Sequence, residues 1–264
     1  MTQTNPKLMT VVLLAAGLQG CASLPPGSVP VPGDPWERYN RAAYAFNDTV
    51  DRAVLKPVAQ GYKAVTPDVV RQGVGNFFGN LSDIPTVAND ILQGQFKSAA
   101  THVGRVAVNS TFGLLGLVDL ATRMGMERQR ADFGQTLGVW GLGSGPYLVL
   151  PLLGPSSVRD TAGLGVDFFT DPVLYLGDGT VREAAAGLRL VDRRARVLDI
   201  EKTLKSIELD PYIFVRDAYL ARRRNAVNHG DSSDRKGEGD QDRTVEASDE
   251  EGLVPLAPPN PAPE

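Results

Sequence analysis

The chain has 264 residues, enough for one or two domains, and 42% of them are apolar, so it has the material for a buried core. The net charge of −4 is unevenly distributed, because ten acidic and three basic residues lie between His229 and Glu264 while the preceding body is nearly neutral. A nucleic-acid-binding protein needs a strongly basic face, so this pattern argues against a nucleic-acid partner.

The chain begins with a pattern typical of export. Lys7 precedes LMTVVLLAAGL, an apolar run too short for a hydrocarbon core that needs about 20 residues. This predicts a signal peptide over residues 1–20. The lone cysteine, Cys21, follows the residues LQG, which resemble a bacterial lipobox in which the glutamine is unusual. We predict that Cys21 is lipidated after cleavage; the alternative is a buried cysteine in a plain helix.

The first helix of the body is predicted from its start signals. Asp34 is a candidate N-cap, Pro35 suits the first helical position, and Glu37 falls at the capping-box position. Apolar residues at spacings of three and four predict an amphipathic helix that ends before Pro57. The residues of this apolar face are Trp36, Tyr39, Ala43, Phe46, Val50 and Ala53.

Further helices are predicted downstream. One begins after the Thr-Pro pair at 66–67 and ends near Gly94, and the next covers residues 95–109. A capping box at 180–183 begins a long charged helix, and the Asp-Pro pair at 210–211 begins the last one. Alternating strand patterns are almost absent, so we expect an all-α body. The apolar face expected for residues 95–109 consists of Phe96, Ala99, Val103 and Val106.

Composition divides the mature chain into three parts. Residues 21–33 form a linker whose four prolines favour an extended spacer that carries the lipidated cysteine. Residues 34–228 form one helical domain. Residues 229–264 are poor in aromatic residues and rich in Asp, Glu, Ser, Gly and Pro, which predicts a disordered acidic tail.

The residues give little support for catalysis. His102 lies in the middle of a predicted helix among apolar neighbours, which is typical of a structural histidine, and His229 lies at the edge of the acidic tail. The glycine-rich stretch at 141–146 fits neither a nucleophile elbow nor a phosphate-binding loop. Asp167 and Asp171 are more typical of capping or solvated carboxylates than of a catalytic pair. We predict no enzyme activity, no metal site and no cofactor.

Two short apolar segments are broken by glycine: FGLLGLV at 112–118, and WGLGSGPYLVLPLLG from Trp140 onward. A helix of about ten residues is roughly 15 Å long, about half of a hydrocarbon core, so segments of this length could enter one leaflet and turn back. The alternative is that both pack in an ordinary core, which periodicity alone favours. The predicted lipid anchor favours the membrane interpretation.

Several stretches together resemble the VacJ/MlaA family, the outer-membrane lipoproteins of the maintenance-of-lipid-asymmetry system. The stretches are DPWERYNRAAYAFND, NFFGNLSDIP, LQG at 92–94, VNSTFGLLGLVDLA, DFGQTLGVWGLGSGPYLVLPLLGPSSVRD and DPYIFVRDAYL. The resemblance extends from about Asp34 to Arg224. The unusual lipobox and the long acidic tail depart from the family pattern.

The resemblance implies a single ring-like, all-helical domain with short amphipathic and leaflet-embedded helices, anchored in the inner leaflet of the outer membrane. It implies removal of phospholipids mislocalised in the outer leaflet, through a polar channel and without covalent chemistry or a cofactor. The implied partners are phospholipid, a trimeric porin of the OmpC/OmpF kind and MlaC, a periplasmic lipid carrier. Two alternatives stay open from the residues: a structural periplasmic lipoprotein that scaffolds a porin or the envelope, and a lipoprotein-anchored hydrolase, which the few histidines disfavour.

The resemblance also gives the second glycine-broken apolar segment a physical interpretation, because Tyr147 to Leu153 could form a glycine-rich hairpin beside the channel. The candidate lipid-channel or hairpin residues are Trp140, Gly141, Gly143, Gly145, Pro146, Tyr147, Leu150 and Pro151. The candidate polar residues of the channel lining are Asn109, Ser110, Thr111 and Arg159.

Overall fold

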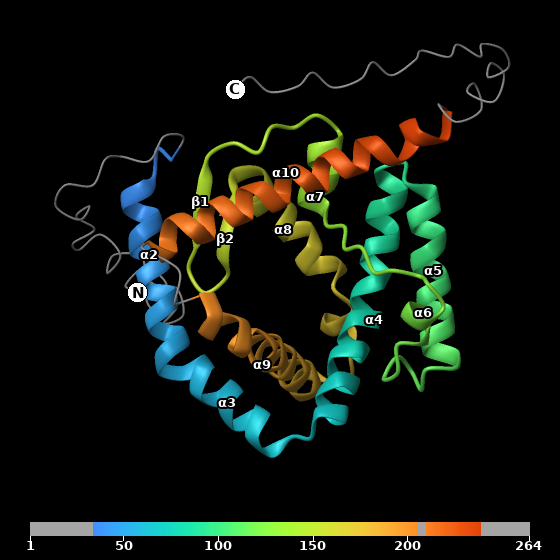
Figure 1. The fold of residues 1–264 in the computed structure, drawn as a ribbon, viewed down its shortest axis with the longest axis horizontal. Helices are drawn as coiled ribbons and strands as arrows, with labels where there is room; N and C mark the ends of the chain where they lie inside the picture. Colours follow the sequence, from blue (N-terminus) through green and yellow to red (C-terminus); the bar gives the residue numbers. More distant parts are fainter. Residues whose placement is uncertain (1–33, 205–209, 239–264) are drawn as a thin grey trace, which may run out of the picture.

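Helices arranged as a ring make up most of the computed structural model, which describes residues 34–204 and 210–238 (Figure 1). One side of the ring is a continuous helical segment, the other is a pair of neighbouring helices, and two long helices cross between the sides. The elements are α2 (Glu37–Val50), η1 (Asp51–Leu55), α3 (Lys56–Val65), α4 (Asp68–Leu92), α5 (Phe96–Thr111), α6 (Leu120–Arg123), α7 (Phe133–Val139), β1 (Tyr147–Leu150), β2 (Gly154–Ser157), α8 (Val158–Thr170), η2 (Pro172–Tyr175), α9 (Gly179–Leu204) and α10 (Pro211–Glu238).

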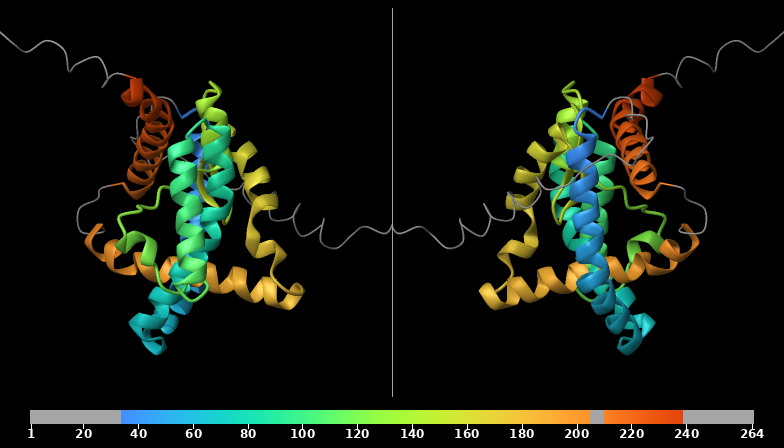
Figure 2. Two further views of the ribbon diagram at one scale, coloured as in Figure 1. Left: turned by 90° about the vertical axis from the view of Figure 1, so that its right-hand side faces the viewer. Right: turned by 90° about the vertical axis from the view of Figure 1, so that its left-hand side faces the viewer.

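The side views show how the ring is built in depth (Figure 2). Helix α10 lies on one face and α8 on the other, while α9 runs across and contacts both α3 and α4. The expectation of a ring-like, mainly helical domain is confirmed. Helix α10 continues to Glu238, past the predicted domain end at Asn228, and the disorder of the acidic tail stays a prediction. The signal peptide, Cys21 and residues 239–264 lie outside the described residues.

The first helical segment runs without a break from α2 through η1 into α3, so its predicted end before Pro57 is wrong. Proline lacks the N–H that an α-helix needs, but here it lies in the first turn of α3, directly after a π-helical turn. The helix therefore continues through the π-helical turn and past the proline.

The predicted capping box at the start of α2 is also wrong. Trp36 is the N-cap residue, and no side chain caps the helix. Asp34 instead accepts a hydrogen bond from Asn40 Nδ2 at 2.8 Å, and Glu37 forms an ion pair with Arg41 at 2.8 Å. Both carboxylates therefore bond to side chains one to two turns further along the chain, in α2.

Other helix boundaries follow the sequence more closely. Helices α4 and α5 begin and end within a few residues of the predicted positions. Asp210 caps α10, because its Oδ1 accepts the Tyr212 N–H at 3.0 Å. The capping box predicted at 180–183 is wrong, since Asp178 caps α9 by accepting the Val181 N–H at 3.0 Å.

The predicted hairpin is present as a two-stranded antiparallel sheet of β1 and β2. Its register pairs Tyr147 with Ser157 at one end and Leu150 with Gly154 at the turn. Tyr147 and Val149 are buried, whereas the side chains at the turn are exposed. The face of the hairpin that carries Tyr147 and Val149 is therefore packed against the rest of the protein.

Two asparagines of α2 bind the edge of β1 that does not pair with β2. Asn40 Nδ2 donates to the Tyr147 carbonyl at 3.0 Å, and its Oδ1 accepts the Val149 N–H at 2.8 Å. Asn47, two helical turns further on, makes the matching pair of bonds near the hairpin turn, at 2.9 and 2.7 Å. The asparagine side chains thus occupy the hydrogen-bonding positions of a neighbouring strand, which protects the edge of β1.

The interior is unusually polar. Arg105 is completely buried, its Nε donates to Asp83 at 3.1 Å and its Nη2 to Asp119 at 3.1 Å. His102 is also buried; its Nδ1 lies 2.7 Å from Asp90 Oδ2, and its Nε2 accepts the Gln129 N–H at 3.3 Å, which supports the structural role predicted for it. Buried apolar residues are mostly small, such as alanine.

The exterior is correspondingly apolar. Within 112–118, Phe112, Leu114, Leu115 and Leu117 are all exposed, so the packed-core interpretation is wrong for these four residues. Large exposed apolar residues normally mark a surface that contacts lipid or another protein. Among the described residues, no helix is both long enough and apolar enough to span a bilayer.

Candidate functional site

A cavity of about 510 Å³ lies between the glycine-rich loop at 141–145, the start of β1, the start of α8 and the middle of α10. In Figure 1 the loop passes from α7 to β1 beside α10. The residues that line the cavity are Gly138, Gly141, Leu142, Gly143, Ser144, Gly145, Tyr147, Ser157, Arg159, Asp160, Tyr219, Leu220, Arg223, Arg224, Val227 and Asn228.

The loop has its shape because glycine occupies two left-handed positions. Gly141 has φ of 95° and Gly145 has φ of 65°, a region that side chains disfavour. Gly143, between these two positions, has no left-handed φ. Arg159 fastens the loop to α8, since its Nη1 donates to the Leu142 carbonyl at 3.3 Å.

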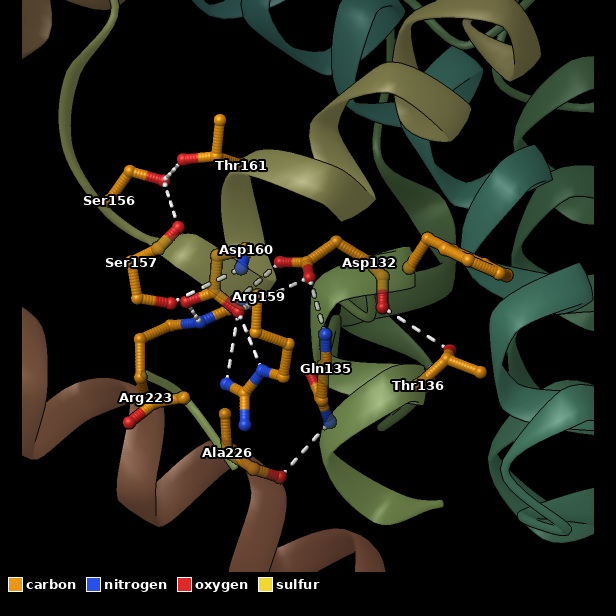
Figure 3. Close-up of polar contacts among 12 residues, drawn as sticks. Asp132, Gln135, Thr136, Ser156, Ser157, Arg159, Asp160, Thr161, Arg223 and Ala226 are labelled. Atoms are coloured by element: carbon orange, nitrogen blue, oxygen red, sulfur yellow. Dashed lines mark hydrogen bonds and ion pairs between the residues drawn. The ribbon is translucent and has the colours of Figure 1, made fainter. Parts of the chain in front are cut away.

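An ionic network forms the floor of the cavity (Figure 3). Asp160 accepts hydrogen bonds from Arg159 Nε at 3.0 Å, Arg223 Nη2 at 2.7 Å and the Tyr219 hydroxyl. Arg223 also donates to Asp132 Oδ1 at 2.8 Å. The network therefore joins three elements: α10, the start of α8, and the residue before α7.

The hydrogen bonds keep Asp160 ionised. Burial alone would raise its pKa, but the bonds from Arg223 and Tyr219 outweigh burial and lower the pKa to about 2. Asp167 lies about two helical turns further along α8, and its pKa is shifted in the opposite direction. Burial raises its pKa to about 6, the Phe133 N–H bond offsets only part of that effect, and the charge of Asp132 adds to it.

Two donors beside this network have no internal partner. Tyr147 is 2% exposed, and its hydroxyl makes no hydrogen bond with any described residue. Burial raises its pKa, so the hydroxyl stays protonated. Arg224 is exposed on the same cavity, and its guanidinium forms no ion pair within the described part of the chain.

The structure brings together half of the predicted hairpin residues. Gly141, Gly143, Gly145 and Tyr147 line the cavity. Trp140 is exposed, and its indole Nε1 donates to the Leu92 carbonyl at 2.9 Å. Pro146, Leu150 and Pro151 belong to the hairpin or its approach and do not line the cavity.

Of the predicted polar lining, only Arg159 borders the cavity. Asn109 is buried; its amide donates to Asp119 at 3.0 Å and its Oδ1 accepts the Ala121 N–H at 3.0 Å, which closes the loop before α6. Ser110 accepts a bond from Asn80 Nδ2 at 3.0 Å, and Thr111 is exposed at the end of α5.

Asp167 and Asp171 are caps, as expected: Asp167 accepts the Phe133 N–H at 2.9 Å, and Asp171 accepts the Val173 N–H at 3.1 Å. The described residues contain no group of side chains suited to hold a metal ion. Sequence analysis missed five cavity or floor residues, although all lie in or beside the quoted family stretches: Asp132, Asp160, Tyr219, Arg223 and Arg224.

Fold and site together define a ring-shaped helical protein with an apolar exterior, an ionised interior and an open polar cavity. The family model for the MlaA lipoprotein matches residues 32–226. The chain belongs to the MlaA lipoprotein family, which confirms the resemblance.

Relatives and a solved structure agree with this assignment. The "Intermembrane phospholipid transport system lipoprotein MlaA" of Escherichia coli (strain K12) is 35% identical over 75% of this chain and 80% of its own length. The Haemophilus influenzae protein of the same name is 32% identical over 84% of this chain and 91% of its own. A chain from the study "Structural basis for maintenance of bacterial outer membrane lipid asymmetry" is 32% identical and superposes with a TM-score of 0.64, covering 74% of this chain and 98% of that one.

Proposed function

We propose that this protein is the lipoprotein component of an intermembrane phospholipid transport system and removes misplaced phospholipid from the outer leaflet of the outer membrane. The relatives carry this function in their names, and the chain covers most of their length. The observation that carries the proposal in this molecule is the inverted polarity of the body, with ionised groups inside and large apolar side chains outside.

Three exposed leucines sharpen that observation. Leu114, Leu115 and Leu152 have φ of 53°, 59° and 64°, and they are 68%, 74% and 69% exposed. A side chain at positive φ costs about 1–2 kcal/mol, which glycine or asparagine would avoid. Leucine at such strained and exposed positions is explained if these side chains enter a hydrocarbon layer, where each gains more than the strain costs.

One substitution tests this insertion, because it should change thermal stability and vesicle binding in different directions. Leu115→Asn relieves backbone strain, so the thermal stability of the detergent-solubilised protein should stay level or rise. The same change places an amide in the lipid layer, so binding to outer-membrane-like vesicles should fall. Leu188→Asn, on exposed α9 with ordinary helical φ, is the matched control. Unchanged vesicle binding by Leu115→Asn contradicts insertion at this loop.

The interior offers a polar route for a headgroup. Burial lowers the pKa of Arg130, and its neighbour Arg128 lowers it further; burial and then Arg130 do the same for Arg193 on α9. Arg130 therefore lies close enough to Arg193 of α9 for its charge to act there, and both side chains are exposed to solvent. A cation-rich interior lowers the cost of moving a phosphate away from water.

The anchor and the partners complete the proposal. Cys21 is proposed as the lipidated N-terminus, which with the apolar loops holds the body in the inner leaflet of the outer membrane. A trimeric porin and the periplasmic carrier MlaC are proposed as partners. Intact-mass analysis tests the anchor, since an unmodified Cys21 or a mature N-terminus elsewhere contradicts it. Co-purification from cross-linked envelopes tests the partners.

The function itself is tested in a Gram-negative strain that lacks its own family member. Expression of this protein should lower the amount of phospholipid in the outer leaflet and restore resistance to detergent. The control is Cys21→Ser, which is made but not anchored. If the wild-type chain restores a porin complex while outer-leaflet phospholipid stays high, the protein is a scaffold and the transport proposal is wrong.

A further inference from the structure

We propose that the cavity beside the glycine-rich loop is a binding site for the phosphate of a phospholipid headgroup, with Arg224 and the free backbone N–H groups of the loop as its donors. This proposal rests on the proposed transport function and identifies where in the molecule the headgroup is held. The site is built from side chains of α10 and β1 and from the backbone of the loop at 141–145.

The charges of the cavity favour an anion. Arg159 and Arg223 are neutralised by Asp160 and Asp132, with which they form short ion pairs. Arg224 is left over and gives the cavity a surplus positive charge. A guanidinium pairs well with phosphate because its planar N–H groups match two phosphate oxygens.

The loop contributes backbone donors. The N–H groups of Gly143, Ser144 and Gly145 make no hydrogen bond within the described residues. A Cβ placed on Gly141 or Gly143 would meet no other atom within 4 Å, so the loop presents bare backbone to open space. Consecutive free N–H groups beside an arginine are a common arrangement for holding an anion.

Size and lining fit one headgroup together with its glycerol. Cavities of about 300–1,000 Å³ hold small ligands, and this one measures about 510 Å³. Its apolar lining comes from Leu142, Leu220 and Val227, which suit the glycerol and the first carbons of the acyl chains. The polar and apolar walls therefore match the two ends of a lipid rather than a free ion.

The test uses the full-length protein in detergent and isothermal titration with three probes: dioctanoyl phosphatidylglycerol, glycerol 3-phosphate and inorganic phosphate. We expect the short-chain lipid to bind, and Arg224→Gln to weaken it about tenfold or more. Arg222→Gln, on the same helix but not lining the cavity, is the matched control and should bind as the parent does.

Thermal unfolding separates ligand binding from folding. Arg224 forms no ion pair within the described residues, so Arg224→Gln should unfold at the same temperature as the parent while it binds the lipid less tightly. Equal affinities of the parent and Arg224→Gln for the lipid would overturn the site.

The other probes distinguish the source of the phosphate. Binding of glycerol 3-phosphate or inorganic phosphate as tight as that of the lipid would overturn a headgroup site in favour of a site for free phosphate. The cellular assay separates the two proposals. If Arg224→Gln binds lipid normally while the parent still clears the outer leaflet, the site is wrong and the transport function stands; if the parent fails to clear it, the function is wrong.

Discussion

Asp160→Asn tests whether the ionic floor holds the cavity together. Asp160 accepts five side-chain hydrogen bonds, four of them from Arg159 and Arg223, whose side chains are 5% and 10% exposed. Asparagine keeps the shape but removes the charge, so two buried guanidinium groups lose their shared counter-ion. Removing one partner of a buried ion pair typically costs about 3–5 kcal/mol.

Thermal unfolding followed by circular dichroism measures this cost. For a body of this size, 1 kcal/mol corresponds to about 2–4 °C, so Asp160→Asn should lower the melting temperature by about 6–20 °C. Asp217→Asn is the matched control, because Asp217 on α10 pairs with Arg216 at an exposed position and should matter by less than about 2 °C. A melting temperature of Asp160→Asn within that control range refutes the argument.

The pH dependence gives a second measurement of the same residue. The pKa of Asp160 is lowered to about 2 in the folded protein, against about 4 in an unfolded chain. Its stabilisation is therefore complete above about pH 4 and is lost as the pH falls toward about 2. The parent should lose stability across this interval, and Asp160→Asn should lose much less.

Three further changes have defined outcomes. The pKa of Asp167 is raised to about 6, so it destabilises the fold as the pH rises from about 4 to 6; Asp167→Asn should flatten that decline in melting temperature, and an unchanged slope would argue against it. Leu152→Ala should leave stability unchanged because the side chain is exposed, whereas Val149→Ala should cost about 2 kcal/mol; equal losses would show that the hairpin turn is packed. Asn40→Ala should cost at least about 3 kcal/mol because it leaves two backbone groups of β1 unpaired, and loss no larger than that of exposed Asn225→Ala would contradict the role of Asn40.

Local signals in the sequence were sufficient for much of the fold. Pairs such as Asp210-Pro211 marked the helix starts, and the glycines and prolines after Trp140 marked a hairpin. These signals act through residues a few positions apart, so they survive in any tertiary context. The π-helical turn before Pro57 was missed because it depends on how a helix adjusts its own spacing, which composition does not encode.

The side of each helix that faces inward could not be predicted in this way. In α5, Phe96 and Val103 belong to the predicted apolar face and are exposed, whereas Arg105 and Asn109 are buried. Periodicity identifies an apolar stripe but does not say whether the stripe meets protein or lipid. In a protein whose exterior contacts lipid, the apolar stripe faces outward and the polar side chains face inward, which is the reverse of a water-soluble protein.

The cavity was hidden for a related reason. Arg223 is held by Asp132 and Asp160, which lie 91 and 63 residues earlier in the chain, while its neighbour Arg224 has no such partner. Nothing in the run ARRRN distinguishes the two arginines. Only the contact of α10 with α7 and with the start of α8 gives one a structural role and leaves the other free for a ligand.

The neighbouring contact between α7 and α8 depends on two glycines, Gly134 and Gly163, and substituting one of them tests the whole arrangement. A Cβ on Gly163 of α8 would lie 2.4 Å from the backbone nitrogen of Gly134 in α7, a distance that backbone atoms cannot accommodate without moving. A Cβ on Gly165, half a turn further on, would meet nothing within 4 Å. Gly165→Ala should therefore gain up to about 1 kcal/mol of helix stability, whereas Gly163→Ala should lose about 1–3 kcal/mol by overpacking.

The two variants should also differ in ligand binding. Moving α7 away from α8 separates Asp132, the N-cap of α7, from Arg223, and it shifts the glycine-rich loop that follows α7. Gly163→Ala should therefore bind dioctanoyl phosphatidylglycerol less tightly than the parent, while Gly165→Ala binds it equally well. Melting temperatures and titrations of the two variants side by side decide the matter. If Gly163→Ala is as stable as Gly165→Ala and binds lipid as well, close packing of α7 on α8 does not hold the cavity in shape.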